Sequence, residues 1–208
     1  MLFIIQPERN DFMKKTVITI SREYGSGGRI IGKKLAEALG ISFYDGELLS
    51  LVAKESGYTE EFVRQNDQKK TQSLLYHLYM GSQILPASDM IFIAQSRVIK
   101  DLHSKESCVI VGRCADYVLR GKDDVINIFI HAPLESRAER VKSEYGEQAE
   151  NFTTHVRKKD KSRVAYYNYF ADDSWGKAQS YDLSVNSDIG IDNAVKIIVD
   201  YVKAKQGE

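Results

Sequence analysis

The sequence predicts a single α/β domain with a parallel sheet, and three observations support this fold class. The 208 residues are enough for one domain with a hydrophobic core, or at most one domain with a small insert. Five short apolar runs are interspersed with longer helical patterns along the chain. The first two runs enclose a glycine cluster and one helical pattern, which makes a βαβ unit, and such units form parallel sheets.

The first unit is predicted as strand, turn, helix and strand. Thr16–Ser21 is a β-branched run typical of a buried strand, and a cluster of glycines follows it. Apolar residues then recur at helical spacing from Ile31 to Leu39, and Gly40 stands where glycine commonly ends a helix. Ile41–Tyr44 is the second predicted strand.

The middle of the chain adds a helical region and three more strands. Residues 47–104 are predicted to be mostly helical, with the last of these helices entered from Ser88 and Asp89 as its cap. Pro133 suits the first turn of a helix that follows the fourth strand. The three further strands are predicted at residues 108–111, 125–130 and 183–185.

Two helical patterns complete the domain. A long polar helix is predicted from about residue 147 to residue 166, and an amphipathic helix over residues 191–202 closes the chain. Residues 1–14 are interpreted as an N-terminal extension. Residues 15–208 are therefore predicted to form one domain.

The charge balance and the two cysteines exclude several classes of function. Lys and Arg total 29, as do Asp and Glu, so zero net charge gives no support to binding of nucleic-acid polymers or membranes. Cys108 and Cys114 lack the spacing of metal ligands, and no residue is assigned to a metal. Without a transmembrane span or a secretory signal pattern, a cytoplasmic protein is expected. A homodimer is compatible with this size, although no pattern indicates one.

We call residues 21–29, Ser-Arg-Glu-Tyr-Gly-Ser-Gly-Gly-Arg, the glycine turn. Glycines between a strand and a helix allow positive φ and let backbone N–H groups converge on an anion, to which the helix N-terminus adds partial positive charge. Arg29, with Arg22 as a second candidate, could supply a full charge. A tight turn without a ligand is the alternative, but its place in the first βαβ unit favours phosphate binding.

The glycine turn, followed by Phe-Tyr-Asp-Gly at residues 43–46, resembles the cytidylate kinase-like family, which is related to the P-loop nucleoside-monophosphate kinases. The resemblance implies a P-loop NTPase-type three-layer sandwich with a five-stranded parallel sheet. It also implies a helical insert of the type that binds nucleoside monophosphates, at about residues 47–104, and a lid at about residues 145–170. The implied reaction transfers a phosphoryl group from ATP to a nucleotide, with Mg²⁺, and the expected acceptor is CMP or dCMP.

The glycine turn departs from the usual P-loop pattern Gly-x-x-x-x-Gly-Lys-Ser/Thr. Aligned on Gly25 and Gly27, the sequence has Gly28 at the lysine position and Arg29 at the hydroxyl position. Arg29 is the predicted replacement for the lysine charge, although a guanidinium binds phosphate as a flat fork rather than as a point charge. The predicted donor-binding residues are Gly25, Ser26, Gly27, Gly28 and Arg29.

Two strand ends are predicted to bind the acceptor. Asp45 and Gly46 follow the second strand, where the resemblance implies the start of the monophosphate site; a strand-end cap is the alternative for Asp45. Gly112 and Arg113 follow the third strand and resemble the Gly-Arg pair that contacts the monophosphate in cytidylate kinases. Carboxyl ends of parallel strands are ligand-binding positions, and a surface ion pair is the alternative for Arg113.

Two helical segments contribute further charges. Arg137 and Arg140 lie one turn apart and resemble the Arg-Ala-x-Arg element of the family, in which two guanidiniums could clamp a transferring phosphoryl group. A solvated helix face is the alternative. Asp160 and Arg163 lie in a basic cluster that resembles the lid. Catalysis is therefore assigned to Arg29, Arg137, Arg140 and Arg163, and acceptor binding to Asp45, Gly46, Arg113, Asp160 and Arg163.

Three functions are compatible with these residues. The first is phosphoryl transfer from ATP to a nucleoside monophosphate. The second is a non-catalytic nucleotide-binding sensor, which the missing lysine and hydroxyl favour. The third is a kinase for a non-nucleotide metabolite, favoured because the Tyr-Arg element expected shortly after Gly46 is missing. Turnover would distinguish the first from the second, and a screen of acceptors would distinguish the first from the third.

Overall fold

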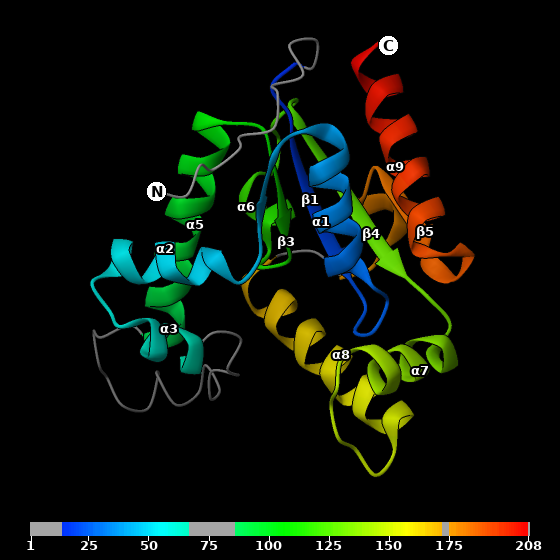
Figure 1. Ribbon diagram of the computed structural model, residues 1–208. Coiled ribbons are helices and arrows are strands. Elements are labelled where there is room, and N and C mark those ends of the chain that lie inside the picture. Colours follow the sequence, from blue (N-terminus) through cyan, green and yellow to red (C-terminus); the bar gives the residue numbers. More distant parts are fainter. Residues whose placement is uncertain (1–13, 67–85, 172–174, 208) are drawn as a thin grey trace, which may run out of the picture.

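The computed structural model describes residues 14–66, 86–171 and 175–207, and a five-stranded parallel sheet forms its centre (Figure 1). The strands lie in the order β2-β3-β1-β4-β5, and each neighbouring pair is parallel. Their bounds are β1 Val17–Arg22, β2 Ser42–Tyr44, β3 Cys108–Val111, β4 Val125–His131 and β5 Leu183–Asn186. The predicted α/β class and the five parallel strands are confirmed.

Helices cover both faces of the sheet, which gives three layers (Figure 1). One face carries α1 (Gly28–Leu39) and α9 (Ile191–Gln206). The opposite side carries α2 Glu47–Ser56, α3 Glu60–Asn66, α5 Ala87–Lys105 and α6 Ala115–Val118. Beyond the carboxyl ends of the strands, α7 (Leu134–Glu144) packs against α8 (Phe152–Phe170).

Side chains of β1 enter two hydrophobic cores on opposite faces of the sheet. Ile18 and Ile20 pack beneath α1 and α9, whereas Val17 packs beneath α2 and α5, and all three side chains are fully buried. This division follows from the alternation of side chains along a strand. Because each such burial stabilises the fold by about 1.5–3 kcal/mol, the two cores fix the position of the turn that follows β1.

Several helix boundaries differ from the sequence prediction, including the end of α8 at Phe170 rather than at about residue 166. α5 begins at Ala87 with Pro86 as its N-cap, rather than after Ser88 and Asp89, because the extended backbone of Pro86 (φ −54°, ψ 150°) leads directly into the first turn. α8 begins only at Phe152, because the Asn151 side chain caps the helix by accepting a hydrogen bond from the Thr154 N–H. The last helix continues to Gln206 rather than to residue 202.

Parts of two predicted segments lie outside the described residues. These are residues 1–13 of the predicted N-terminal extension and residues 67–85 of the predicted helical insert. The described remainder of the insert consists of α2, α3 and α5, and the predicted lid, residues 145–170, contains α8. Within the described ranges, every helix is too short or too polar to cross a lipid bilayer.

Candidate functional site

β1 and β3 are neighbouring interior strands, and their carboxyl ends border a common crevice. The chain leaves β1 through α1 on one face, and it leaves β3 through α6 on the opposite side. The two strands are neighbours, so their ends open on a topological switch point, which is where open α/β sheets bind ligands. The glycine turn follows β1 directly and borders this crevice.

The backbone of the glycine turn has the shape of an anion cradle. Gly25 and Gly27 adopt φ of +78° and +77°, which glycine tolerates and other residues rarely adopt. α1 begins at Gly28, its first turn carries no acidic side chain, and no side chain of the described residues caps it. The N–H groups at this helix start therefore suit a phosphate.

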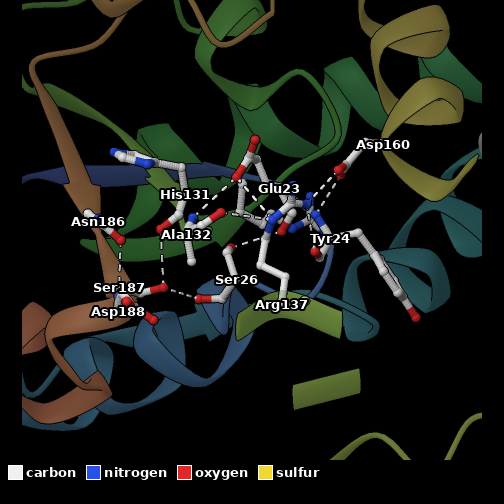
Figure 2. A network of polar contacts seen from close by, with 12 residues as sticks. Glu23, Tyr24, Ser26, His131, Ala132, Arg137, Asp160, Asn186, Ser187 and Asp188 are labelled. Atoms are coloured by element: carbon white, nitrogen blue, oxygen red, sulfur yellow. Dashed lines mark hydrogen bonds and ion pairs between the residues drawn. The ribbon is translucent and has the colours of Figure 1, made fainter. Parts of the chain in front are cut away.

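Ser187, which directly follows β5, contacts the backbone of the glycine turn (Figure 2). The Ser187 hydroxyl lies 2.6 Å from the carbonyl oxygen of Ser26 and 3.2 Å from that of His131, so it ties the turn to β4. The Ser26 hydroxyl donates to the Glu23 carbonyl at 2.9 Å, and both serines are fully buried. Sequence reasoning missed Ser187, because a contact to a backbone carbonyl 161 residues away leaves no local signal.

A cavity of about 620 Å³ lies against the glycine turn, within the range of small-molecule sites. Several predicted site residues from separate elements share its wall. Its lining residues are Arg22, Glu23, Tyr24, Gly25, Gly28, Arg29, Ile30, Asp45, Glu144, Tyr145 and Arg163. Residues predicted to bind the donor and residues predicted to bind the acceptor therefore line the same cavity. Gly46 is not among the lining residues and is the N-cap of α2.

Arg113 lines a smaller neighbouring cavity of about 30 Å³, together with Arg22 and Arg163, which line both cavities. The backbone after β3 is strained here: Gly112, Arg113 and Cys114 have φ of +74°, +59° and +53°. Each non-glycine residue in this region costs about 1–3 kcal/mol, and such strain clusters at functional sites. The buried Gln95 holds the conformation by donating from Nε2 to the Arg113 carbonyl at 3.0 Å.

Arg137 lies at the centre of a buried polar network (Figure 2). Its Nε donates to the Ala132 carbonyl at 3.0 Å, and its Nη1 donates to the Tyr24 carbonyl at 3.0 Å and to Asp160 Oδ2 at 2.5 Å. Glu23 lies 3.3 Å from Nε, and Arg137 is only 6% exposed. This arginine therefore holds the glycine turn against α7 and α8, because a buried charge requires such partners.

Arg140 contacts the turn from the next helical turn of α7. Its Nη1 donates to the Gly25 carbonyl at 2.8 Å, and its Cζ lies 3.7 Å from the position that a Cβ would take at Gly27. Glu144 lies 3.8 Å from its Nε. Arg137 and Arg140 thus both reach the turn, and Arg140 is beside the anion cradle.

Helix α8, in the predicted lid segment, brings Asp160 and Arg163 to the turn. Asp160 Oδ1 accepts a hydrogen bond from the Tyr24 N–H at 2.7 Å, and Arg163 Nη1 donates to the Arg22 carbonyl at 2.9 Å. The Arg163 guanidinium also lies 5.0 Å from the centre of the Tyr24 ring, a cation–π contact. Burial lowers the pKa of Arg163 from its usual value, so an anion entering the cavity would relieve the cost of burying this charge.

Arg29 and Asp45 form an ion pair in the wall of the cavity, with Arg29 Nε 2.7 Å from Asp45 Oδ2. The Arg29 side chain is 72% exposed, whereas that of Asp45 is only 17% exposed. Besides the two predicted roles of Asp45, a strand-end cap or a site residue, the structure shows a third role, as the ion-pair partner of Arg29.

The cavity wall fits a divalent cation that arrives with a nucleotide better than a resident metal. Across the described ranges, no group of three or more His, Cys, Asp or Glu side chains could hold a metal ion. Mg²⁺ bound with phosphates usually takes only one or two protein carboxylates and keeps several waters. Glu23 and Asp45 line the cavity and could supply these two oxygens.

Residues 17–189 match the profile of the cytidylate kinase-like family. The chain belongs to this family. A protein of Methanosarcina mazei named cytidylate kinase is 29% identical over 175 residues, which cover 82% of this chain and 87% of that protein. The resemblance inferred from the glycine turn and the Phe-Tyr-Asp-Gly segment is thereby confirmed.

Solved structures resemble this cytidylate kinase-like chain over most of its length. An uncharacterised protein from Eubacterium ventriosum aligns with a TM-score of 0.69 and 30% identity, over 91% of this chain and 99% of that one. Shikimate kinase from Acinetobacter baumannii aligns with a TM-score of 0.55 and 15% identity, over 95% and 98% of the two chains. The fold is that of P-loop kinases, and family and fold together support a kinase acting on a nucleotide or another small molecule with ATP, typically with Mg²⁺.

Proposed function

We propose that this protein transfers the γ-phosphoryl group of ATP to a nucleoside monophosphate, CMP or dCMP, in the cytoplasm. The observation that carries the proposal is the 620 Å³ cavity, in which the glycine turn, Asp45 and Arg163 meet at the switch point of the sheet. The relatives named cytidylate kinase support the choice of acceptor. A parallel sheet with a phosphate-binding turn at this place suits a nucleotide donor.

The donor would bind at the glycine turn. The backbone N–H groups of Gly25–Gly28 and the start of α1 would hold phosphate oxygens, and Arg29 would add a charge from the cavity wall. Mg²⁺ bound with ATP would neutralise part of the phosphate charge, held by the carboxylates of Glu23 and Asp45. Asp45 pairs with Arg29 in the structure. Donor binding would therefore either break this ion pair or add a phosphate or Mg²⁺ contact to one of its two side chains.

The acceptor would bind on the side of β3 and the lid. Arg113 and Arg163 line adjoining cavities and would fix its phosphate with charge-assisted hydrogen bonds. Asp45 and Gly46 would border the acceptor at the end of β2. Asp160 already bonds to the Tyr24 N–H and to Arg137, so its contribution to acceptor binding would include positioning the lid against the turn.

Catalysis would consist of positioning and charge, because phosphoryl transfer needs no covalent nucleophile from the protein. Arg140 and Arg163 border the cradle and would stabilise charge on the transferring group. Arg137 is enclosed by protein partners, so we assign it a positioning role. It would hold the glycine turn and α8 in fixed positions relative to one another.

The test is ADP production from Mg-ATP with CMP, dCMP, UMP, AMP, GMP or no acceptor. We expect stimulation by CMP or dCMP, and a loss of kcat/KM of about 10²–10³-fold in Arg163→Gln, because a charge at the transferring group is removed. Arg97→Gln is the matched control, since Arg97 is 70% exposed on α5 and lies outside the site. Equal turnover in wild type and Arg163→Gln would contradict the assigned role.

A nucleotide-binding sensor is the second candidate, favoured by the lid helix that already bonds to the glycine turn through Asp160 and Arg163. Thermal stabilisation by Mg-ATP without turnover on any acceptor would support the sensor. Turnover on a sugar or a hydroxy acid, but on no nucleotide, would instead support a metabolite kinase.

A further inference from the structure

Two departures from the P-loop pattern lie at positions that touch one another. In Gly-x-x-x-x-Gly-Lys-Ser/Thr, the first glycine is five residues before the second. With Gly27 as the second glycine, Arg22 stands at the first glycine and Gly28 stands at the lysine. The chain therefore carries a cation where the pattern has glycine, and glycine where the pattern has a cation.

The stem of Arg22 occupies the space that a side chain at residue 28 would need. A Cβ at Gly28 would lie 2.7 Å from the Arg22 Cβ and 2.8 Å from its Cγ, closer than real Cβ contacts. Gly28 is the first residue of α1, and its φ lies outside the left-handed region. Space, rather than backbone conformation, is what requires glycine at this position.

The Arg22 guanidinium reaches across the crevice to the end of β3. A Cβ at Gly112 would lie 1.9 Å from Arg22 Nη1 and 2.9 Å from Cζ, so the guanidinium packs directly over the Gly112 backbone. The Arg22 side chain lines both the large cavity and the small cavity of Arg113. Its backbone is held by the hydrogen bond from Arg163 to its carbonyl.

We propose that Arg22, rather than Arg29, supplies the charge that the P-loop lysine supplies in the usual pattern, and that it contacts the phosphoryl group during transfer. The proposal rests on the proposed kinase function. Arg22 extends from the turn to the border between donor and acceptor sides, whereas Arg29 is 72% exposed and paired with Asp45. Gly28 is then glycine because the Arg22 side chain needs its space, and at Gly112 the same need for space adds to the positive φ of +74°.

The first experiment compares Arg22→Gln, Arg22→Lys and Arg29→Gln for kcat, for KM of ATP and for thermal unfolding. We expect Arg22→Gln to lower kcat about 10²–10³-fold, because one charge on the transferring group is lost. Arg22→Lys should recover part of this loss, since it restores a cation of different shape. Arg29→Gln should have a smaller effect on kcat and act mainly on KM. Arg97→Gln is again the unaffected control.

The second experiment exchanges the two positions. Gly28→Lys should impair both folding and turnover, because its Cβ collides with the Arg22 stem. Arg22→Gly should lose turnover while folding normally. The double variant Arg22→Gly/Gly28→Lys should exceed both single variants in kcat, because it removes the collision and restores a lysine at the pattern position. A double variant no better than either single variant would overturn the proposal.

Failure of this inference is distinguishable from failure of the proposed function. An active wild type with an equally active Arg22→Gln variant would overturn the role of Arg22 alone. If the wild type binds Mg-ATP without turnover, Arg22→Gln should weaken Mg-ATP binding at least about tenfold, and unchanged binding would overturn the role. A wild type that neither binds nor turns over Mg-ATP would overturn both proposals.

Discussion

At the scale of single residues, Gly25 has two separate reasons to be glycine. Its φ is +78°, and a Cβ there would lie 2.6 Å from the Arg137 carbonyl oxygen and 3.0 Å from a methyl carbon of Val141. The first reason is conformational and the second is steric, because α7 packs directly on the turn. A substitution at this residue would therefore disturb the helix that carries Arg137 and Arg140.

Gly121→Ala separates the two effects, since Gly121 has φ +77° but a Cβ there meets no described atom within 4 Å. We expect Gly121→Ala to lower the free energy of unfolding by about 1 kcal/mol through backbone strain alone. Gly25→Ala should lower it by about 2–4 kcal/mol, because strain and overpacking add. Urea unfolding of both variants measures this, and equal losses would show that the contact with α7 contributes nothing.

The sequence indicated which elements carry the candidate site residues, but it did not indicate the contacts that these residues make. Arg29, Asp45 and Arg163 each sit in or beside a turn or lid pattern, so their meeting at one cavity follows from the fold. The ion pair of Arg29 with Asp45 could not be predicted, because it depends on side-chain conformations across the cavity. The partners of Arg137 were missed for a similar reason: the Ala132 and Tyr24 carbonyls are backbone groups, which no residue pattern reveals.

At the scale of elements, α8 and the segment before it also contact the glycine turn near the amino end of the helix. Glu147 accepts a hydrogen bond from the Tyr24 hydroxyl and lies 2.7 Å from His155 Nε2. The Tyr24 hydrogen bond, supported by that of His155, lowers the pKa of Glu147 below its usual 4.5. Tyr145 adds an edge-to-face contact with the Tyr24 ring.

This depressed pKa makes part of the stability dependent on pH. The contribution of Glu147 is fully present above the unfolded-state pKa of 4.5 and is lost as the pH falls through the lower folded-state pKa. The difference in unfolding free energy between wild type and Glu147→Gln should therefore shrink between about pH 6 and pH 3. Exposed Glu150, changed to Gln, is the control and should give no such pH-dependent difference. A constant difference for Glu147→Gln would contradict the assigned contacts.

Element boundaries were predicted well where glycine or proline marks them. Gly40 ends α1 in the left-handed conformation, as the sequence indicated. The start of α8 was predicted too early, because residues 147–151 are mostly polar and fit a helical pattern, while the Asn151 cap depends on its backbone conformation (φ −139°). A polar helix has a weak apolar period, so its ends are poorly defined by pattern alone.

At the scale of the whole molecule, one sheet separates two cores, and we expect them to unfold together as the single domain predicted for residues 15–208. Ile99 is fully buried in the core of α2 and α5, and Ile198 is fully buried in the core of α1 and α9. Each change to alanine should cost about 2–5 kcal/mol. Because β1 and β3 contribute to both cores, each variant should lower the midpoint of one common transition, followed by circular dichroism in urea.

Two transitions, each moved by only one of these variants, would contradict the single domain. Exposed Ile197→Ala, next to Ile198 on α9, is the matched control and should change the midpoint little.

The sequence predicted all five strands, but the order β2-β3-β1-β4-β5 is a finding of the structure. Apolar runs identify strands without indicating their neighbours, since runs such as those of β1, β3 and β4 are largely buried on both faces and would fit several positions in a parallel sheet. The order matters for function, because it places the end of β3, and with it Gly112, beside the end of β1.

The collision between residue 28 and the Arg22 stem also limits how such a loop could arise by single substitutions. Starting from a loop with glycine at 22 and lysine at 28, acquiring Arg22 first would create the collision. Losing the lysine first would avoid it, but the intermediate would carry neither cation. Both orders of substitution therefore pass through an intermediate protein with impaired folding or turnover. The exchange would be rare and, once complete, hard to reverse.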